Sequence, residues 1–243
     1  MFELVISDKA CEEISFLQLA KQLKREVQLL KGVFVYDQFA GRERICFAVP
    51  KKMADYALAR AKDEIAEHLA VEYKYRFFDQ RLELFGLDEL MRTAFLSALA
   101  VFDKETDKKY ILEHLNFFDE VNIDSCFAFC MPLLQERWTE IVSLVESNMF
   151  ELMANEGLLE MMKFLIRSCP VESEEVFVGQ TENLFLIENA RREVQFEFEK
   201  NVSGRKKLVH QLVNLVPKKL VVCTGLDIGL KKIFEERVFE IVR

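Results

Sequence analysis

Apolar positions recur along this chain with two different periods, and the change of period divides the sequence into three parts. The first residues form an apolar run that predicts a short buried strand. Apolar residues at three- and four-residue spacing then predict a helix over residues 16–30, with Gly32 as its C-terminal cap. Residues 33–49 predict two strands around a turn that contains Gly41. Residues 1–50 are therefore predicted to form a β-α-β-β unit.

The middle part, residues 51–170, keeps the helical period almost throughout. Residues 51–84 carry an apolar stripe among charges and strong helix formers, which predicts a long amphipathic helix. Asp88 is placed to cap the next helix, and further helical patterns continue as far as Pro170. Trp138 falls on an apolar helix face, so it is predicted to be a core residue and not a stacking platform for a ligand.

The last part, residues 171–243, mixes both periods. Two short apolar runs around a polar turn predict a hairpin, and residues 194–199 alternate like a half-exposed strand. Ser203 is predicted to cap a helix whose apolar residues at 208–216 face inward. A buried strand, a short helix and a final strand then predict a β-α-β unit, with a right-handed crossover if its strands are parallel.

These patterns together predict an α+β protein with a small N-terminal β-α-β-β unit, a largely helical middle and a C-terminal mixed unit with a hairpin and a β-α-β. The predicted regions are residues 1–50, 51–170 and 171–243, and they could also pack as one domain. The pattern leaves open whether the strands of the two ends share one sheet. With 243 residues, 51% of them hydrophobic, the chain can bury a sizeable core.

The composition also bears on compartment. No apolar run reaches the ~18 residues that a membrane span requires. The start, "MFELVISDKACEEIS", lacks the basic lead of a signal peptide, so a cytoplasmic protein is expected. The six cysteines are scattered through apolar segments, as is typical of reduced core thiols and not of a disulfide framework.

Cys126 and Cys130 are spaced one helical turn apart and could contact a metal ion together. Two further ligands at a known spacing are missing from their neighbourhood, so core packing is the favoured interpretation. No metal and no cofactor is predicted.

Charge is unevenly distributed. The net charge is −8, but residues 191–243 contain twelve Lys/Arg against seven Asp/Glu, a balance of +5 that leaves −13 for residues 1–190. Such asymmetry lets two parts of one protein attract each other, which is the favoured reading, or it marks a surface for a partner.

The stretch "SGRKKLVHQLVNLVPKKLVVC", residues 203–223, concentrates this positive charge. Three cations in the predicted first turn of a helix oppose the helix macrodipole at a cost of about 0.3 to 1 kcal/mol each. A phosphate, another acidic ligand or nucleic acid would relieve that cost, although neutralisation within the chain or by solvent is favoured. No exposed aromatic residues interleave with the cluster, which disfavours single-stranded nucleic acid. The candidate anion- or partner-binding residues are Arg191, Arg205, Lys206, Lys207, Lys218 and Lys219.

Signals of catalysis are weak, and no catalytic residue is predicted. His68, His114 and His210 fall in separate predicted helices, and no spacing joins them to a nucleophile or an acid. The glycine patterns of the standard phosphate loops are missing. The segment "TGLDIG" follows a predicted strand and could offer amides to an anion, but an ordinary turn with Asp227 as a helix cap is favoured.

Several motifs resemble one known family. The runs "ERW", "MMKFLI", "EEVFV" and "LFLIENARRE" occur in an order similar to that in the YtxC family of sporulation proteins, and "LVHQLVNLVPKKLVV" and "IFEERV" resemble the later part of that family. The resemblance extends from about Ala48 onward and consists chiefly of packing residues. It implies an origin in an endospore-forming member of the Firmicutes and a cytosolic role connected with sporulation. The family supplies no established catalytic residues, so none is transferred.

The leading hypothesis is therefore a non-enzymatic, sporulation-associated protein that acts through contacts with a protein partner. The alternative is an anion- or nucleic-acid-binding module that uses the basic C-terminal surface. The sequence specifies neither the identity of the partner nor the oligomeric state.

Overall fold

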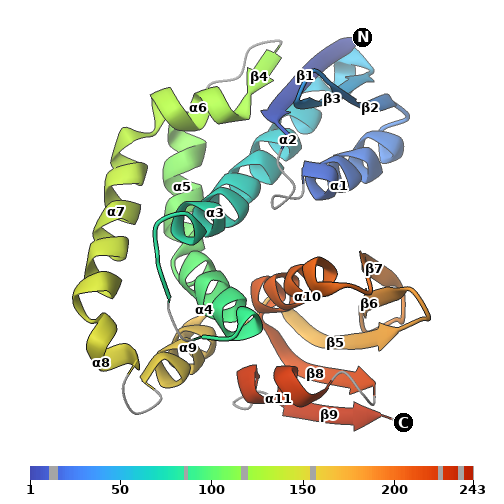
Figure 1. Cartoon of the computed structure of the whole chain (residues 1–243). Coiled ribbons are helices and arrows are strands. Elements are labelled where there is room, and N and C mark those ends of the chain that lie inside the picture. The colour runs from blue at the N-terminus through green and yellow to red at the C-terminus, as the bar shows by residue number, and fades with distance from the viewer. Residues whose placement is uncertain are drawn as a thin grey trace. The chain divides into compact units, whose positions relative to one another are not determined.

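The computed structural model contains two compact units, and each unit combines helices with its own sheet (Figure 1), which confirms the α+β class. Unit 1 comprises residues 1–80 and 104–142, and unit 2 comprises residues 81–103 and 143–243. Both units draw on the helical middle of the sequence. The structure describes residues 1–10, 16–84, 87–115, 120–153, 157–223, 227–234 and 238–242.

The sheet of unit 1 has the strand order β2-β3-β1-β4. Strand β1 pairs antiparallel with β3 and parallel with β4, and β2 pairs antiparallel with β3. The first three strands follow the prediction, whereas the three-residue β4 was not predicted because it is too short to show a period. The strands are β1 (Phe2–Lys9), β2 (Val33–Phe39), β3 (Arg42–Val49) and β4 (Glu120–Asn122).

Helix α1 of unit 1 packs on β2 and β3, and α2 packs against α1 and α5. The predicted helix from residue 51 is nearly continuous to Asp79, but it widens into a π-helical turn, η2, before α3 begins. A π turn adds a residue to one turn of a helix and so rotates the following side chains. The helical elements are α1 (Phe16–Leu29), η1 (Lys51–Met53), α2 (Ala54–His68), η2 (Leu69–Tyr73), α3 (Lys74–Asp79), α5 (Lys104–His114), α6 (Ile123–Cys130) and α7 (Pro132–Ser147), whose last turn belongs to unit 2.

The end of α1 corrects the predicted cap. Lys31, and not Gly32, has the left-handed conformation, with φ of 56°. The amides of Lys31 and Gly32 donate to the carbonyls of Gln28 and Val27 at 3.0 and 2.9 Å, the bond pattern of a Schellman motif. Gly32 is needed for a different reason, since a Cβ atom there would lie 2.6 Å from the carbonyl oxygen of Ala48.

The sheet of unit 2 has the order β7-β6-β5-β8-β9. The predicted hairpin is β5 and β6, and the predicted β-α-β has parallel strands β8 and β9, so both predictions are confirmed. The strands of the two chain ends thus form separate sheets. The elements are α4 (Glu89–Val101), α8 (Met149–Met153), α9 (Gly157–Ser168), β5 (Ser173–Gln180), β6 (Leu184–Glu188), β7 (Val194–Glu199), α10 (Val202–Leu215), β8 (Pro217–Cys223), α11 (Asp227–Ile233) and β9 (Val238–Val242).

The helix caps of unit 2 follow the prediction in one case and depart from it in another. Asp88 caps α4, because its carboxylate accepts from the amides of Leu90 and Met91. Helix α10 begins earlier than predicted: Asn201 is its cap and accepts from the amide of Gly204 at 2.7 Å, so the prediction of Ser203 was wrong. Asparagine and serine are both good caps, so residue preference alone does not decide between them.

Candidate functional site

A fully buried ion pair lies in the interior of unit 1. The side chains of Lys74 and Asp107 are both 0% exposed, and Lys74 Nζ lies 2.7 Å from Asp107 Oδ2. The indole Nε1–H of Trp138 donates to the same oxygen at 2.8 Å, and Arg137 approaches Oδ1 at 3.2 Å. The ammonium of Lys74 also lies 5.9 Å from the ring centroids of Phe78 and Trp138, within cation-π range. We call these residues the buried ionic centre.

A second buried carboxylate in unit 1 is that of Asp8, on β1. The hydroxyl of Tyr73 donates to Asp8, and His68 Nε2 lies 3.7 Å from the other oxygen of Asp8, too far for a hydrogen bond. Burial, followed by the negative charge of Asp8 and this hydrogen bond, raises the pKa of Tyr73 well above its usual value. The His68 ring is edge-on to Phe16 and Tyr73. These contacts lock side chains together in a packed interior.

Sequence reasoning placed Trp138 correctly in the core but missed its carboxylate partner. The partner is 31 residues away in the sequence, on another helix, and "DKETDKKY" around Asp107 reads as a solvated helix face. Lys74 offered a signal, because it lies between Tyr73 and Tyr75 in the run "YKYRFF". A lysine flanked by aromatic residues on both sides has few solvated positions, and its burial was open to prediction.

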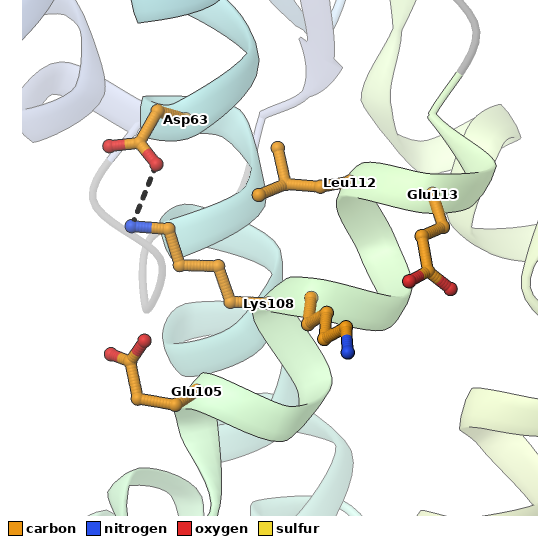
Figure 2. A pocket seen from close by; sticks show the side chains of 6 residues that line it. Asp63, Glu105, Lys108, Leu112 and Glu113 are labelled. Carbon is orange, nitrogen blue, oxygen red and sulfur yellow. Dashed lines mark ion pairs between the residues drawn. The ribbon is translucent and has the colours of Figure 1, made fainter.

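A surface hollow of about 410 Å³ lies between α2 and α5 in unit 1 (Figure 2). Lys108 Nζ pairs there with Asp63 at 3.0 Å and with Glu67 at 3.2 Å. Partial burial opposes the charged form of Lys108, but these carboxylates outweigh it and raise its pKa. Binding pockets for small molecules have largely apolar walls, whereas charged residues dominate this lining. The hollow is lined by Asp63, Glu105, Lys108, Lys109, Leu112 and Glu113.

The cysteines divide by exposure. Cys169 is buried as predicted, whereas Cys130 is exposed at the end of α6, so the prediction of core packing was wrong for that residue. Burial raises the pKa of the Cys126 thiol, which disfavours the thiolate that a metal requires. Among the described residues no group of three or more His, Cys, Asp or Glu could hold a metal ion. Cys11 lies outside the described residues.

The other predicted candidates occupy different places. His210 is buried in unit 2 with its Nδ1 2.8 Å from the hydroxyl of Ser97, and His114 lies at the exposed end of α5, in unit 1. Most of "TGLDIG", including the side chain of Asp227, falls outside what the structure describes.

Half of the predicted basic residues are paired with carboxylates inside unit 2. Lys206 pairs with Glu89 of α4. Lys218 and Lys219, at the start of β8, pair with neighbouring glutamates of β5 at 3.0 and 2.9 Å. The remaining members are Arg191, in the turn between β6 and β7, and Arg205 and Lys207, on α10.

The topology of unit 2 divides these six residues into two groups. Strands β5, β7 and β8 run in the same direction, because β6 is antiparallel to its neighbours and β5 is parallel to β8. Arg191, Lys218 and Lys219 therefore lie toward the end of the sheet where these strands begin. Residues 205–207 lie at the opposite end, because α10 starts directly after β7. With Asn201 as the cap, these three cations fall at or beyond the fourth position of α10, where the macrodipole penalty is smaller than predicted.

A different surface stands out on unit 1. Strand β2 lies at the edge of its sheet and, among the described strands, pairs with β3 alone. Its seven residues, "VFVYDQF", contain no proline, and the register with β3 runs without a bulge. Natural edge strands are usually blunted by proline, bulges, lysine or short length, so this edge is a ready template for strand pairing.

The two faces of β2 differ. Alternate residues face α1, as Tyr36 shows with its ring 6.3 Å from that of Phe16. The opposite face, which we call the open face, carries Val33, Val35 and Phe39, which are 63, 51 and 71% exposed. Three exposed large apolar side chains on one face of a strand, with Asp37 between Val35 and Phe39, are unusual for solvent-facing positions. The open face continues onto β3 and β1, where Cys46, Ala48 and Val5 are partly exposed in register with β2.

No protein-family model, no curated protein and no solved structure matches this chain. None of the helices in the described ranges combines the length and the apolar character that crossing a membrane demands.

Proposed function

We propose that this protein acts by binding a protein partner through the free edge and the open face of β2, and not by catalysis. The observation that carries this proposal is a seven-residue edge strand with Val33, Val35 and Phe39 more than half exposed. Exposed apolar side chains beside unpaired backbone groups favour a partner that supplies an extended strand.

The chemistry of unit 1 supports a binding role over an enzymatic one. Asp8 and Asp107 are buried and already accept hydrogen bonds from Tyr73, Lys74 and Trp138. A general acid or base has to reach a substrate, and groups enclosed by packing do not. Asp107 joins α3, α5 and α7, and Asp8 joins β1 to η2, so both carboxylates serve the packing of unit 1.

The alternative of an anion-binding module has less support. Lys206, Lys218 and Lys219 have carboxylate partners, and the six basic residues are divided between two ends of a sheet. A phosphate or nucleic acid would have to displace existing ion pairs and would meet no single basic face. The proposed setting, a cytoplasmic role in sporulation, rests on the sequence resemblance alone.

Site-specific photo-crosslinking tests the proposal. A photoreactive amino acid replaces Val35 on the open face or, as a control, Leu133, an equally exposed leucine on α7. In the cells that produce the protein, we expect a discrete crosslinked species from position 35 and none from position 133. Loss of the species in a Val33→Lys background would assign it to β2. Equal crosslinking at both positions, or none at position 35, contradicts the proposal.

A further inference from the structure

We propose that the strand bound at β2 is β2 of a second copy of this chain, paired antiparallel across a two-fold axis at Tyr36. This inference rests on the proposed function and names its partner. The two four-stranded sheets would then form one continuous sheet. Its basis is that β2 complements itself in backbone hydrogen bonds and in apolar side chains, and that the pairing brings no like charges directly opposite each other.

The backbone determines which residues can pair at the free edge. Ala40 and Gly41, with φ of 51° and 75°, form a two-residue hairpin turn between Phe39 and Arg42. In such a hairpin the residues that flank the turn exchange hydrogen bonds, and every second pair after them does the same. Odd-numbered residues of β2 therefore bond to β3. Residues Phe34, Tyr36 and Gln38 direct their N–H and C=O groups to the free edge.

One antiparallel register uses all three of these residues. With Tyr36 opposite Tyr36 of the second copy, Phe34 of each copy lies opposite Gln38 of the other. Each directly bonded pair contributes two hydrogen bonds, so this register forms roughly six. A shift by two residues in either direction takes one of the three residues beyond the strand. The centred register therefore satisfies the largest number of edge groups.

The same register covers the exposed side chains. Val33 of each copy lies opposite Phe39 of the other, in a pair without direct backbone bonds, where side chains approach most closely. Both residues are more than 60% exposed in the single chain. A β-branched residue across from an aromatic one is a favourable cross-strand pair, and the two-fold axis forms it twice.

Charge agrees with self-pairing as well. Asp37 is the one charged residue in "VFVYDQF", and Arg44 of β3 holds its two oxygens at 2.9 Å each. In the centred register Asp37 lies opposite Val35 of the second copy, so the two carboxylates do not face each other. Like charges directly opposite would have destabilised the pair.

Sedimentation of the full-length protein over a range of concentrations tests the inference. We expect a monomer–dimer equilibrium that Val33→Lys weakens at least tenfold, because the ammonium group faces Phe39. Adding Phe39→Glu to Val33→Lys places opposite charges across both symmetric pairs and should restore most of the affinity. Leu133→Lys on α7 is the matched control and should leave the dimer unchanged. Circular dichroism checks that every variant is folded.

The outcomes separate the two proposals. A protein that stays monomeric at all concentrations, or a dimer that Val33→Lys does not weaken, overturns the second-copy inference. Failure of Phe39→Glu to restore the dimer overturns the centred register and the inference with it. If the chain is monomeric but position 35 still crosslinks to a different protein, the second-copy inference fails and the proposed function stands. If position 35 crosslinks to nothing, both fail.

Discussion

Lys74–Asp107 in unit 1 and Lys218–Glu174 in unit 2 join the same chemical groups at nearly the same distance, 2.7 and 3.0 Å, but in different surroundings. The first pair is 0% exposed on both sides, and the second is 62% and 79% exposed. Water screens the second pair and can replace either partner, whereas it reaches neither partner of the first. Distance alone therefore says little about which pair holds its unit together.

The two pairs also differ in the cost of losing one partner. Two desolvated charges gain little over a well-packed apolar pair, but the loss of one partner removes much of the attraction that offsets the desolvation of the other. In the exposed pairs of unit 2, the loss of one partner returns the other to water. The two units should thus respond very differently to the same kind of substitution.

The largest expected effect comes from Asp107→Asn, which removes the buried negative charge that Lys74 Nζ and Trp138 Nε1 both contact. We expect the free energy of unfolding of unit 1 to fall by about 3 to 5 kcal/mol. Trp138 is the single tryptophan of the chain and lies in this centre, so its fluorescence in a denaturant titration reports on unit 1.

Two comparisons sharpen that result. Replacing both partners, with Lys74→Met and Asp107→Leu, should recover part of the loss because no buried charge is left alone. Glu174→Gln in unit 2 should change the free energy of unfolding, measured by circular dichroism, by less than about 1 kcal/mol. Similar losses for Asp107→Asn and Glu174→Gln would refute the contrast between the units.

The sequence predicted the features that depend on neighbouring residues and missed those that depend on residues far apart in the chain. The strands and helices follow from periods that a few neighbouring residues display, as in β2, β3 and α10. The cap residues were harder to predict, because Lys31 takes the position that was predicted for Gly32 and Asn201 takes the one that was predicted for Ser203. The contact of Lys74 with Asp107 joins residues 33 positions apart, so no local pattern could reveal it.

The exposed edge had a partial signal in the sequence. The stretch "VFVYDQF", rich in β-branched and aromatic residues, predicted a strand, and the turn near Ala40 and Gly41 predicted its partner β3. Its position at the edge depends on β1 lying on the other side of β3, which is a property of the whole sheet. The open face could therefore be identified only from the structure.

An intermediate effect is expected for Tyr73→Phe, which removes the hydroxyl that donates to the buried carboxylate of Asp8. A buried charged acceptor that loses its donor costs about 1.5 to 3 kcal/mol. Tyr56→Phe is a suitable control, because the Tyr56 hydroxyl is exposed and lies 3.4 Å from Glu26. Equal stability of the two variants, measured by Trp138 fluorescence in denaturant, would show that Asp8 does not depend on Tyr73.

The same tyrosine predicts sensitivity to alkali. The pKa of Tyr73 is raised in the folded state, so above about pH 10 the unfolded chain releases a proton that the folded chain keeps. The Tyr73 hydroxyl should therefore add no pH dependence to the free energy of unfolding below that pH. As pH rises beyond it, the free energy of unfolding should fall by up to ~1.4 kcal/mol per pH unit. Burial and Glu43 raise the pKa of Tyr36 to about 12, so Tyr73→Phe should reduce the slope without abolishing it.

The smallest effect on stability is expected at the longest run of consecutive basic residues in the sequence, residues 205–207. Neutralising Arg205, Lys206 and Lys207 to glutamine removes one exposed pair, between Lys206 and Glu89, and reduces an unfavourable macrodipole contribution in α10. These effects oppose each other, so the free energy of unfolding should change by less than about 1 kcal/mol.

The same variant tests the alternative function. If the basic residues of unit 2 form an anion site, retention of the parent protein on a DNA column will fall steeply with salt, and the variant will lose that retention. We expect weak retention of both proteins even at low salt, because half of the predicted basic residues already have carboxylate partners. Strong, salt-sensitive retention that the glutamine variant abolishes would instead establish unit 2 as an anion-binding module. The exposed charges of unit 2 would then matter for binding, although they contribute little to stability.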